Sequence, residues 1–163
     1  MSVPRALFLL LLVVAPIVLW GTGRGLPPMV ASHFGHAGDA NGFMPREGYL
    51  VVMTALVTLL PLLLAVTNGL IPRLTPKRMV RDPGYWLAPP RREASMHALG
   101  TLSCVLGMLL CLFMLAVHFL VLQANAQQPP QLPMPAFFAL LGVFLACLAA
   151  WMLTLFLRFP RPA

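Results

Sequence analysis

Four long apolar stretches dominate the sequence, and short polar segments separate them. A helix of about 20 apolar residues crosses the hydrocarbon layer of a bilayer, which is about 30 Å thick. The four stretches run from Pro4 to Trp20, from Tyr49 to Ile71, from Ala98 to Leu122 and from Ala136 to Leu157. This pattern predicts an all-α integral membrane protein, a four-helix bundle that crosses the bilayer four times.

The first stretch is the shortest, and Arg5 near its start also gives it the form of a secretory signal peptide. No cleavage site of the small-x-small type follows Trp20 cleanly. We therefore interpret the first stretch as an uncleaved membrane anchor.

Each of the other three stretches has a predicted packing face, because small side chains let helices approach closely in lipid. On the second stretch the predicted face is Thr54, Thr58, Pro61, Ala65 and Asn68. On the third stretch and just before it, the face is His97, Gly100, Cys104, Gly107, Cys111, Met114 and His118, and on the fourth it is Ala139, Gly142, Ala146 and Ala149. The His and Cys side chains on the face of the third stretch recur every seven residues, about 10.5 Å along a helix. They are too far apart to share one metal ion, so we predict packing, with a hydrogen-bond partner or water for His118.

Basic residues predict the orientation of the chain. Nine of them fall on one side of the membrane: Arg5, Arg73, Lys77, Arg78, Arg81, Arg91, Arg92, Arg158 and Arg161. Only Arg24 and Arg46 fall on the other side. The positive-inside rule then places both termini in the cytoplasm (N-in/C-in), together with a basic loop over residues 73–97. The loop at residues 21–48 is predicted to lie outside.

The basic loop has two interpretations. Its density of prolines opposes a long helix, and Tyr85 and Trp86 are placed like interfacial anchors. A basic cytoplasmic face of Lys77, Arg78, Arg81, Arg91 and Arg92 is attracted to anionic lipid. The alternative is that this face binds a cytoplasmic partner.

Composition narrows the class of protein. Apolar residues make up 60% of the chain and charged residues 9%, with a net charge of +7. We expect no nucleic-acid partner, because the basic residues lie in short segments between apolar stretches. The interior of the stretches lacks Asp, Glu, Lys and Arg, which disfavours an ion pump or ion-coupled transporter. The three cysteines lie in apolar stretches, so we expect no disulfide framework.

The longest polar segment that combines turn residues, ionisable groups and aromatics covers residues 26–46. Its glycines permit backbone conformations that other residues avoid, and Asp39 and Asn41 suit turns. We predict a compact structured loop on the outer side, with Phe34 and Phe43 available to attach it to the bundle or to lipid headgroups. Its candidate binding or structural residues are Pro27, His33, Phe34, Gly35, Gly38, Asn41, Gly42 and Arg46.

The same loop offers a metal site as an alternative. His33 and His36 are three residues apart and Asp39 adds a carboxylate, a mixed ligand set that suits zinc or copper. Gly35 and Gly38 oppose the regular helix that would align the two imidazoles. We therefore expect no metal or other cofactor. A lipid-modifying enzyme is a weaker alternative, because the outer side offers only Asp39, Glu47 and the two histidines, too few for a catalytic constellation.

The residues of this loop carry a resemblance to a known family. Leu26-Pro27, His33-Phe34-Gly35, Gly38, Asn41-Gly42-Phe43 and Arg46, followed by an apolar stretch, resemble the bacterial domain of unknown function 1648. In that family an aspartate stands at the position of Asn41 and a lysine at that of Arg46. The domain is shared with SdpI-type immunity proteins, which protect cells from a secreted toxin. The resemblance implies a short inner-membrane protein and supplies no catalytic residues.

Together these observations predict three parts of the chain: a two-helix unit at 1–72, the basic loop at 73–97, and a second helix pair at 98–163. The expected function is that of a non-enzymatic binding, regulatory or immunity-type protein of the bacterial inner membrane, acting through the loop at 26–46 and the basic loop at 72–97. Its expected partners are the lipid bilayer and a membrane or peptide partner protein. The sequence leaves the oligomeric state open.

Overall fold

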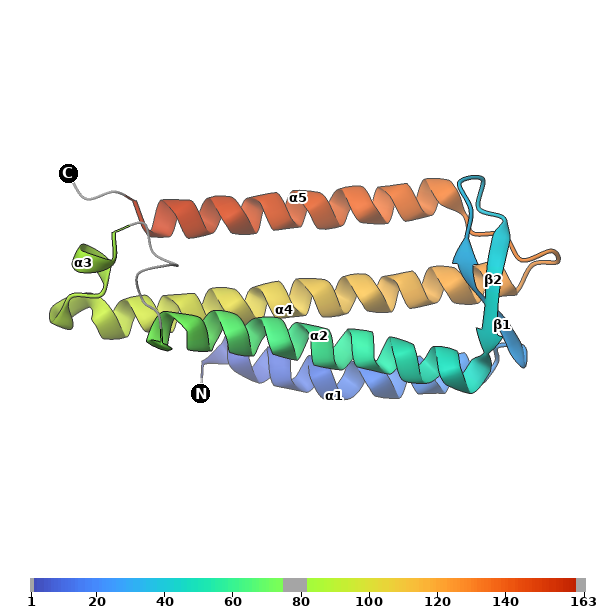
Figure 1. Ribbon diagram of the computed structural model, residues 1–163, viewed down its shortest axis with the longest axis horizontal. Helices are drawn as coiled ribbons and strands as arrows, with labels where there is room; N and C mark the ends of the chain where they lie inside the picture. Colours follow the sequence, from blue (N-terminus) through green and yellow to red (C-terminus); the bar gives the residue numbers. More distant parts are fainter. Residues whose placement is uncertain (1, 75–81, 161–163) are drawn as a thin grey trace.

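The computed structural model describes residues 2–74 and 82–160. Its elements are α1 (Val3–Gly23), β1 (Met29–Phe34), β2 (Ala40–Pro45), α2 (Arg46–Leu74), α3 (Pro83–Trp86), α4 (Pro89–Asn125) and α5 (Met134–Arg158) (Figure 1). The four long helices each contain a segment long and apolar enough to cross a membrane. The prediction of a multi-pass helical membrane protein is confirmed. The loop predicted between the first two spans contains a two-stranded antiparallel sheet.

Helix α4 is the centre of the bundle. It packs against α1, α2 and α5, and α1 also packs against α2. Helix α5 lies along α4 on the side away from α1, and none of its residues is buried (Figure 1). The bundle is therefore a three-helix core of α1, α2 and α4, with α5 attached to one flank.

The three core helices come together at Gly107 of α4. A Cβ atom at this position would lie 2.6 Å from the Phe8 ring of α1 and 3.2 Å from the Pro61 carbonyl oxygen of α2. Gly107, Phe8 and Pro61 are all buried. The absence of a side chain at Gly107 thus permits the close approach of all three helices, as the predicted face of α4 required.

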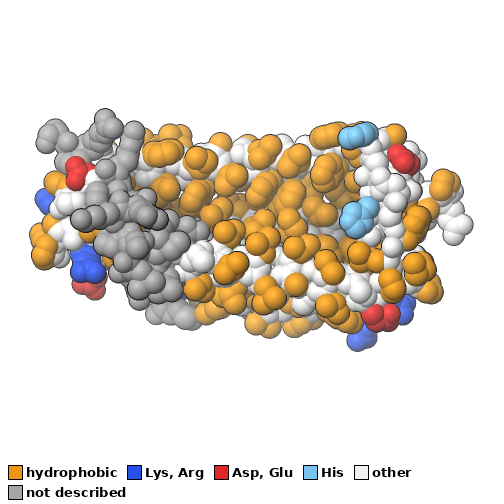
Figure 2. All heavy atoms as spheres, viewed as in Figure 1, with side chains coloured by type: hydrophobic (Ala, Val, Ile, Leu, Met, Phe, Trp, Pro, Cys, Tyr) orange, Lys and Arg blue, Asp and Glu red, His pale blue; other side chains and the backbone are white. Residues whose placement is uncertain are grey.

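The outer surface of the bundle is apolar. Large hydrophobic side chains on α1, α2 and α5 are more than half exposed, including Leu10, Val13, Leu59, Val143 and Leu153. Figure 2 shows hydrophobic side chains covering the middle of the visible face, with charged side chains gathered at its two ends. This distribution matches the hydrocarbon and headgroup layers of a bilayer.

The start of α4 differs from its predicted position. The helix begins at Pro89, nine residues before the predicted start at Ala98. Proline density was expected to oppose a long helix in this segment, and that expectation is wrong for residues 89–97. Pro89 and Pro90 occupy the first turn, where the missing N–H groups have no helical partner in any case. Pro4 and Pro135 stand at the same place in α1 and α5.

The predicted packing face of α5 is also wrong. Its small residues Ala139, Gly142, Ala146 and Ala149 are exposed, and a Cβ atom at Gly142 would meet no atom within 4 Å. Larger side chains make the contact with α4: the Phe144 ring stacks on Phe113, and the Trp151 indole donates to the Leu102 carbonyl at 2.8 Å. On α2, Pro61 is buried, Thr54, Thr58 and Ala65 are half-buried, and the Asn68 side chain lies outside those described.

Two ends of the bundle can now be distinguished. The cap comprises residues 26–46, which include the hairpin, and the α4–α5 loop at 126–133. It covers the end where α1 and α4 finish and α2 and α5 begin (Figure 1). At the opposite end lie the start of α1, helix α3 and the end of α5 (Figure 1). We call this the basic end.

Candidate functional site

The hairpin of the cap closes through a turn that favours glycine. Gly38 has a φ of 85°, in the left-handed region that residues with a side chain rarely adopt. Gly35 N–H donates to the Asp39 carbonyl at 2.7 Å, and Gly38 N–H donates to the Gly35 carbonyl at 3.0 Å. The Leu132 N–H donates to the Gly38 carbonyl at 2.8 Å. The turn is thereby attached to the α4–α5 loop.

The side chain of Asn125 joins strand β1 to α4 by hydrogen bonds. The amide oxygen of Asn125 accepts from the Ala31 N–H at 2.8 Å, and its amide nitrogen donates to the Ala31 carbonyl at 3.0 Å. The same nitrogen donates to the Val121 carbonyl at 2.9 Å. Ala31 is fully buried. Asn125 therefore takes the place of a neighbouring strand and fixes the hairpin on the bundle.

Arg46 has a structural part in the cap. Its guanidinium donates to the carbonyl groups of Arg24 and Leu26, each at 3.2 Å, and its backbone N–H donates to the Pro28 carbonyl at 2.9 Å. It also lies 3.5 Å from the Glu47 carboxylate. The side chain thus holds the chain that leaves α1 against the start of α2.

A pocket of about 290 Å³ lies between the hairpin, α4 and the start of α5, and we call it the cap pocket. Its lining residues are Ser32, His33, Phe34, Gly35, Val117, Leu120, Val121, Leu132, Met134 and Phe137. The hairpin supplies the two polar side chains, Ser32 and His33, and the other elements supply apolar ones. The cap pocket is therefore polar toward the hairpin and apolar toward the two helices.

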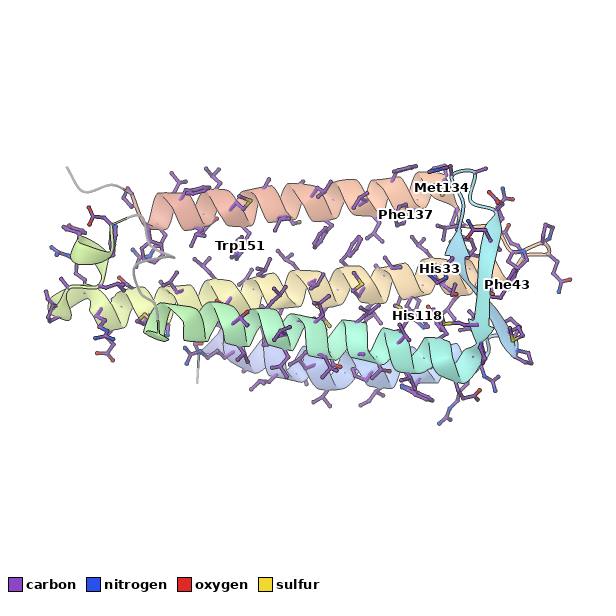
Figure 3. All side chains as sticks on the ribbon, viewed as in Figure 1. His33, Phe43, His118, Met134, Phe137 and Trp151 are labelled. Carbon is purple, nitrogen blue, oxygen red and sulfur yellow. The ribbon has the colours of Figure 1, made fainter. Side chains whose placement is uncertain are left out.

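His33 is the ionisable residue of the cap pocket. Its Nδ1 atom lies 3.0 Å from the Ser32 hydroxyl oxygen, and the side chain is exposed. A Cβ atom at Gly42 would lie 2.9 Å from the His33 Cβ atom, so the absence of a side chain at Gly42 makes room for His33. Figure 3 shows His33 on the bundle side of the hairpin, toward the first turns of α5 that carry Met134 and Phe137. The imidazole thus stands at the polar edge of the cap pocket.

The remaining loop residues selected from the sequence are distributed over the cap. Phe34 is half-buried and packs against the bundle core, whereas Phe43 is 54% exposed on the far side of β2 (Figure 3). Pro27 and Asn41 are exposed. The structure therefore places His33, Phe34 and Gly35 at the cap pocket and the other candidates away from it.

The metal alternative finds no geometric support at the cap. Over residues 2–74 and 82–160, no three His, Cys, Asp or Glu side chains are grouped as a metal ion would require. Since His33, His36 and Asp39 all fall within these ranges, the structure does not bring them together as a ligand set.

Beneath the cap, His118 links three helices. It is fully buried, and its Nδ1 atom lies 2.9 Å from the Tyr49 hydroxyl of α2. Its Nε2 atom lies 2.9 Å from the Thr22 hydroxyl of α1, which donates to the Val18 carbonyl at 2.8 Å. The Thr22 hydroxyl therefore accepts from Nε2–H, and the Tyr49 hydroxyl donates to Nδ1. Since each polar atom is paired, we interpret this cluster as a structural link. It also gives His118 the hydrogen-bond partner that was predicted.

At the basic end, the two predicted interfacial aromatics attach α3 to its neighbours. The Trp86 indole donates to the Pro160 carbonyl at 3.0 Å and contacts the Phe159 ring edge-on. The Arg91 guanidinium lies over the Tyr85 ring, 4.0 Å from its centre. Arg91 and Arg92 are exposed. Lys77, Arg78, Arg81 and Arg161 lie outside the described residues, as does the side chain of Arg73.

Besides the residues of α4 and α5 that line the cap pocket, sequence reasoning missed the role of Asn125. Its signal was a polar amide at the end of an apolar stretch, but nothing in the sequence identified Ala31 as its partner.

Comparisons of the chain with protein-family models, with characterised proteins and with solved structures find no match.

Proposed function

We propose that this protein is a non-enzymatic binding protein of the bacterial inner membrane, and that it binds its ligand or partner at the cap pocket. The observation that carries the proposal is the combination of a polar edge at His33 with apolar walls from α4 and α5. Ligand sites are mostly apolar concave surfaces with a few polar groups that fix orientation. The hydrogen bonds of Asn125 and Arg46 support a site that exists before its ligand arrives.

The resemblance of residues 26–46 to the domain of unknown function 1648 agrees with this proposal. That resemblance predicts an interaction or immunity-type role without catalytic residues. Toxin immunity itself would be an analogy at the level of the fold, so the proposal extends only to binding, with a lipid, a peptide or a membrane protein as the partner.

The proposal includes the orientation of the chain, with both termini cytoplasmic and the cap outside. Its support is the excess of Lys and Arg that the sequence places in the two termini and the loop at 73–97. A cysteine placed at the exposed position of Asn41 in a variant that lacks the native cysteines should react with a membrane-impermeant maleimide in intact spheroplasts. A cysteine at exposed Arg92 should react only after the membrane is permeabilised. The opposite pattern would contradict the orientation.

Photo-crosslinking in native membranes tests the binding function. A photo-reactive phenylalanine analogue at Phe137 lies in the lining of the cap pocket. The same analogue at the adjacent Phe138, which is 59% exposed and outside that lining, is the matched control. We expect a discrete product from position 137 that mass spectrometry identifies as one molecule, and bulk phospholipid from position 138. Identical products at both positions would show that the cap pocket holds only surrounding lipid.

A further inference from the structure

The lining of the cap pocket also constrains the chemistry of what it binds. Its volume of about 290 Å³ is at the lower limit of small-molecule sites, which measure about 300–1,000 Å³. An α-helix, with a diameter of about 10–12 Å, is too wide for such a space. The occupant is therefore a small molecule, or one chain of a larger one.

The position of the cap pocket along the bundle indicates where this molecule comes from. Val117 and Val121 precede the end of α4 at Asn125 by eight and four residues, which places them about 12 and 6 Å from that end. Phe137 lies in the first turn of α5. The apolar walls thus belong to membrane-crossing helices, while His33 stands at the level of the cap. A molecule with one apolar chain and one polar head matches both parts.

The charged side chains around the cap pocket restrict which polar head group a ligand can have. The lining of the cap pocket contains no Lys or Arg, so a phosphate or sulfate head would lack a Lys or Arg partner for its charge. The Asp39 carboxylate lies beside Gly35, because a Cβ atom on Gly35 would be 2.8 Å from its Oδ1 atom. A negative charge at this edge disfavours an anionic head. Ser32 occupies the Nδ1 side of His33, which leaves the Nε2 side to bond a hydroxyl or carbonyl group.

We propose that the cap pocket binds a single-chain amphiphile with a small, uncharged, hydrogen-bonding head, of the class of fatty alcohols and monoacylglycerols. The chain lies between α4 and α5, and the head bonds to His33. This inference rests on the proposed binding function and specifies the ligand class of the same site.

Competition labelling of the purified full chain in phosphatidylcholine nanodiscs tests the proposal. The probe is a monoacylglycerol with a diazirine in its acyl chain, and the competitors are unlabelled monoacylglycerol, lysophosphatidylglycerol and an alkane of equal length. We expect monoacylglycerol to displace the probe at a concentration at least about tenfold below that of the other two, because they carry the wrong charge or no head. Equal or better competition by lysophosphatidylglycerol or by the alkane would overturn the proposal.

Substitutions of two histidines test whether the polar head of the ligand binds at His33. His33→Ala should lower the affinity for the monoacylglycerol about fivefold, a change typical of the loss of one hydrogen bond. His36→Ala is the matched control, since His36 is outside the lining of the cap pocket, and should change nothing. Val117→Phe, which narrows the apolar part, should weaken binding of the chain as well. An unchanged affinity in His33→Ala would overturn the assignment of the head.

Failure of this inference can be told apart from failure of the proposed function. If only the ligand class is wrong, position 137 still captures a discrete molecule in native membranes while the monoacylglycerol probe shows no preference over its competitors. If the binding function is wrong, positions 137 and 138 yield the same lipid products.

Discussion

Gly107→Leu is expected to destabilise the bundle by about 3 kcal/mol, the upper part of the range for overpacked cores. The leucine Cβ atom would lie 2.6 Å from the Phe8 ring and 3.2 Å from the Pro61 carbonyl oxygen, so α1 or α2 would have to move away from α4. Since α4 is central to the bundle, that movement disturbs the whole three-helix core. The measurement is reversible unfolding of the purified protein in mixed detergent micelles.

Gly142→Leu is the matched control for this prediction. It makes the same chemical change in a membrane-crossing helix, and it has the same gain in helix propensity, about 1 kcal/mol in water. A Cβ atom at Gly142 meets no atom within 4 Å. The free energy of unfolding of this variant should therefore lie within about 0.5 kcal/mol of the native value or slightly above it. Equal stability of the two variants would contradict the arrangement of α1, α2 and α4 around Gly107.

Asn125→Leu is expected to release the hairpin from the bundle without unfolding the helices. The change removes three hydrogen bonds and leaves the N–H and C=O groups of fully buried Ala31 without partners. Each unpaired buried group costs about 1–3 kcal/mol. Protection of the Ala31 amide from hydrogen exchange should therefore fall at least about tenfold, while amides in the middle of α4 keep theirs.

Two further variants make this result specific. Asn41→Leu changes an exposed asparagine of the same hairpin and should leave the Ala31 amide protected. Asn125→Asp keeps an acceptor for the Ala31 N–H but loses the donor to its carbonyl, so its effect should be intermediate. Loss of the hairpin should also abolish selective capture at Phe137, because the hairpin supplies one side of the cap pocket. Full protection of Ala31 in Asn125→Leu would show that other contacts hold β1.

The number and approximate positions of the membrane-crossing helices could be predicted from the sequence because both depend on local properties. A helix satisfies its own backbone hydrogen bonds, so a sufficiently long apolar stretch is enough to place it in lipid. The buried seam of α4 was predicted only in part: Gly107, Cys111 and His118 of the predicted face are buried, but His97 is exposed. Near the start of α4 the buried residues are instead Ser95, Leu99 and Ser103. The start of α4 at Pro89 was not predicted, because prolines were taken as helix breakers, whereas Pro89 and Pro90 occupy the first turn of this helix.

The contacts between distant segments could not be predicted in the same way. The sequence shows small residues on α5, but it does not show that the larger side chains of Phe144 and Trp151 make the contact with α4. Helix packing in lipid lacks the hydrophobic signal that separates inside from outside in water, so an apolar helix carries little information about which face turns inward.

The sequence alone thus determined that this chain crosses a membrane with four helices and that residues 26–46 form an ordered segment with His33, because hydropathy and turn chemistry act over short distances. The tertiary structure alone decided that this segment is a hairpin held by Asn125 from 94 residues away and that His33 stands beside α4 and α5. The physical reason is that a hydrogen bond or a pocket depends on which side chains meet in space, and the order of residues in one chain does not state that.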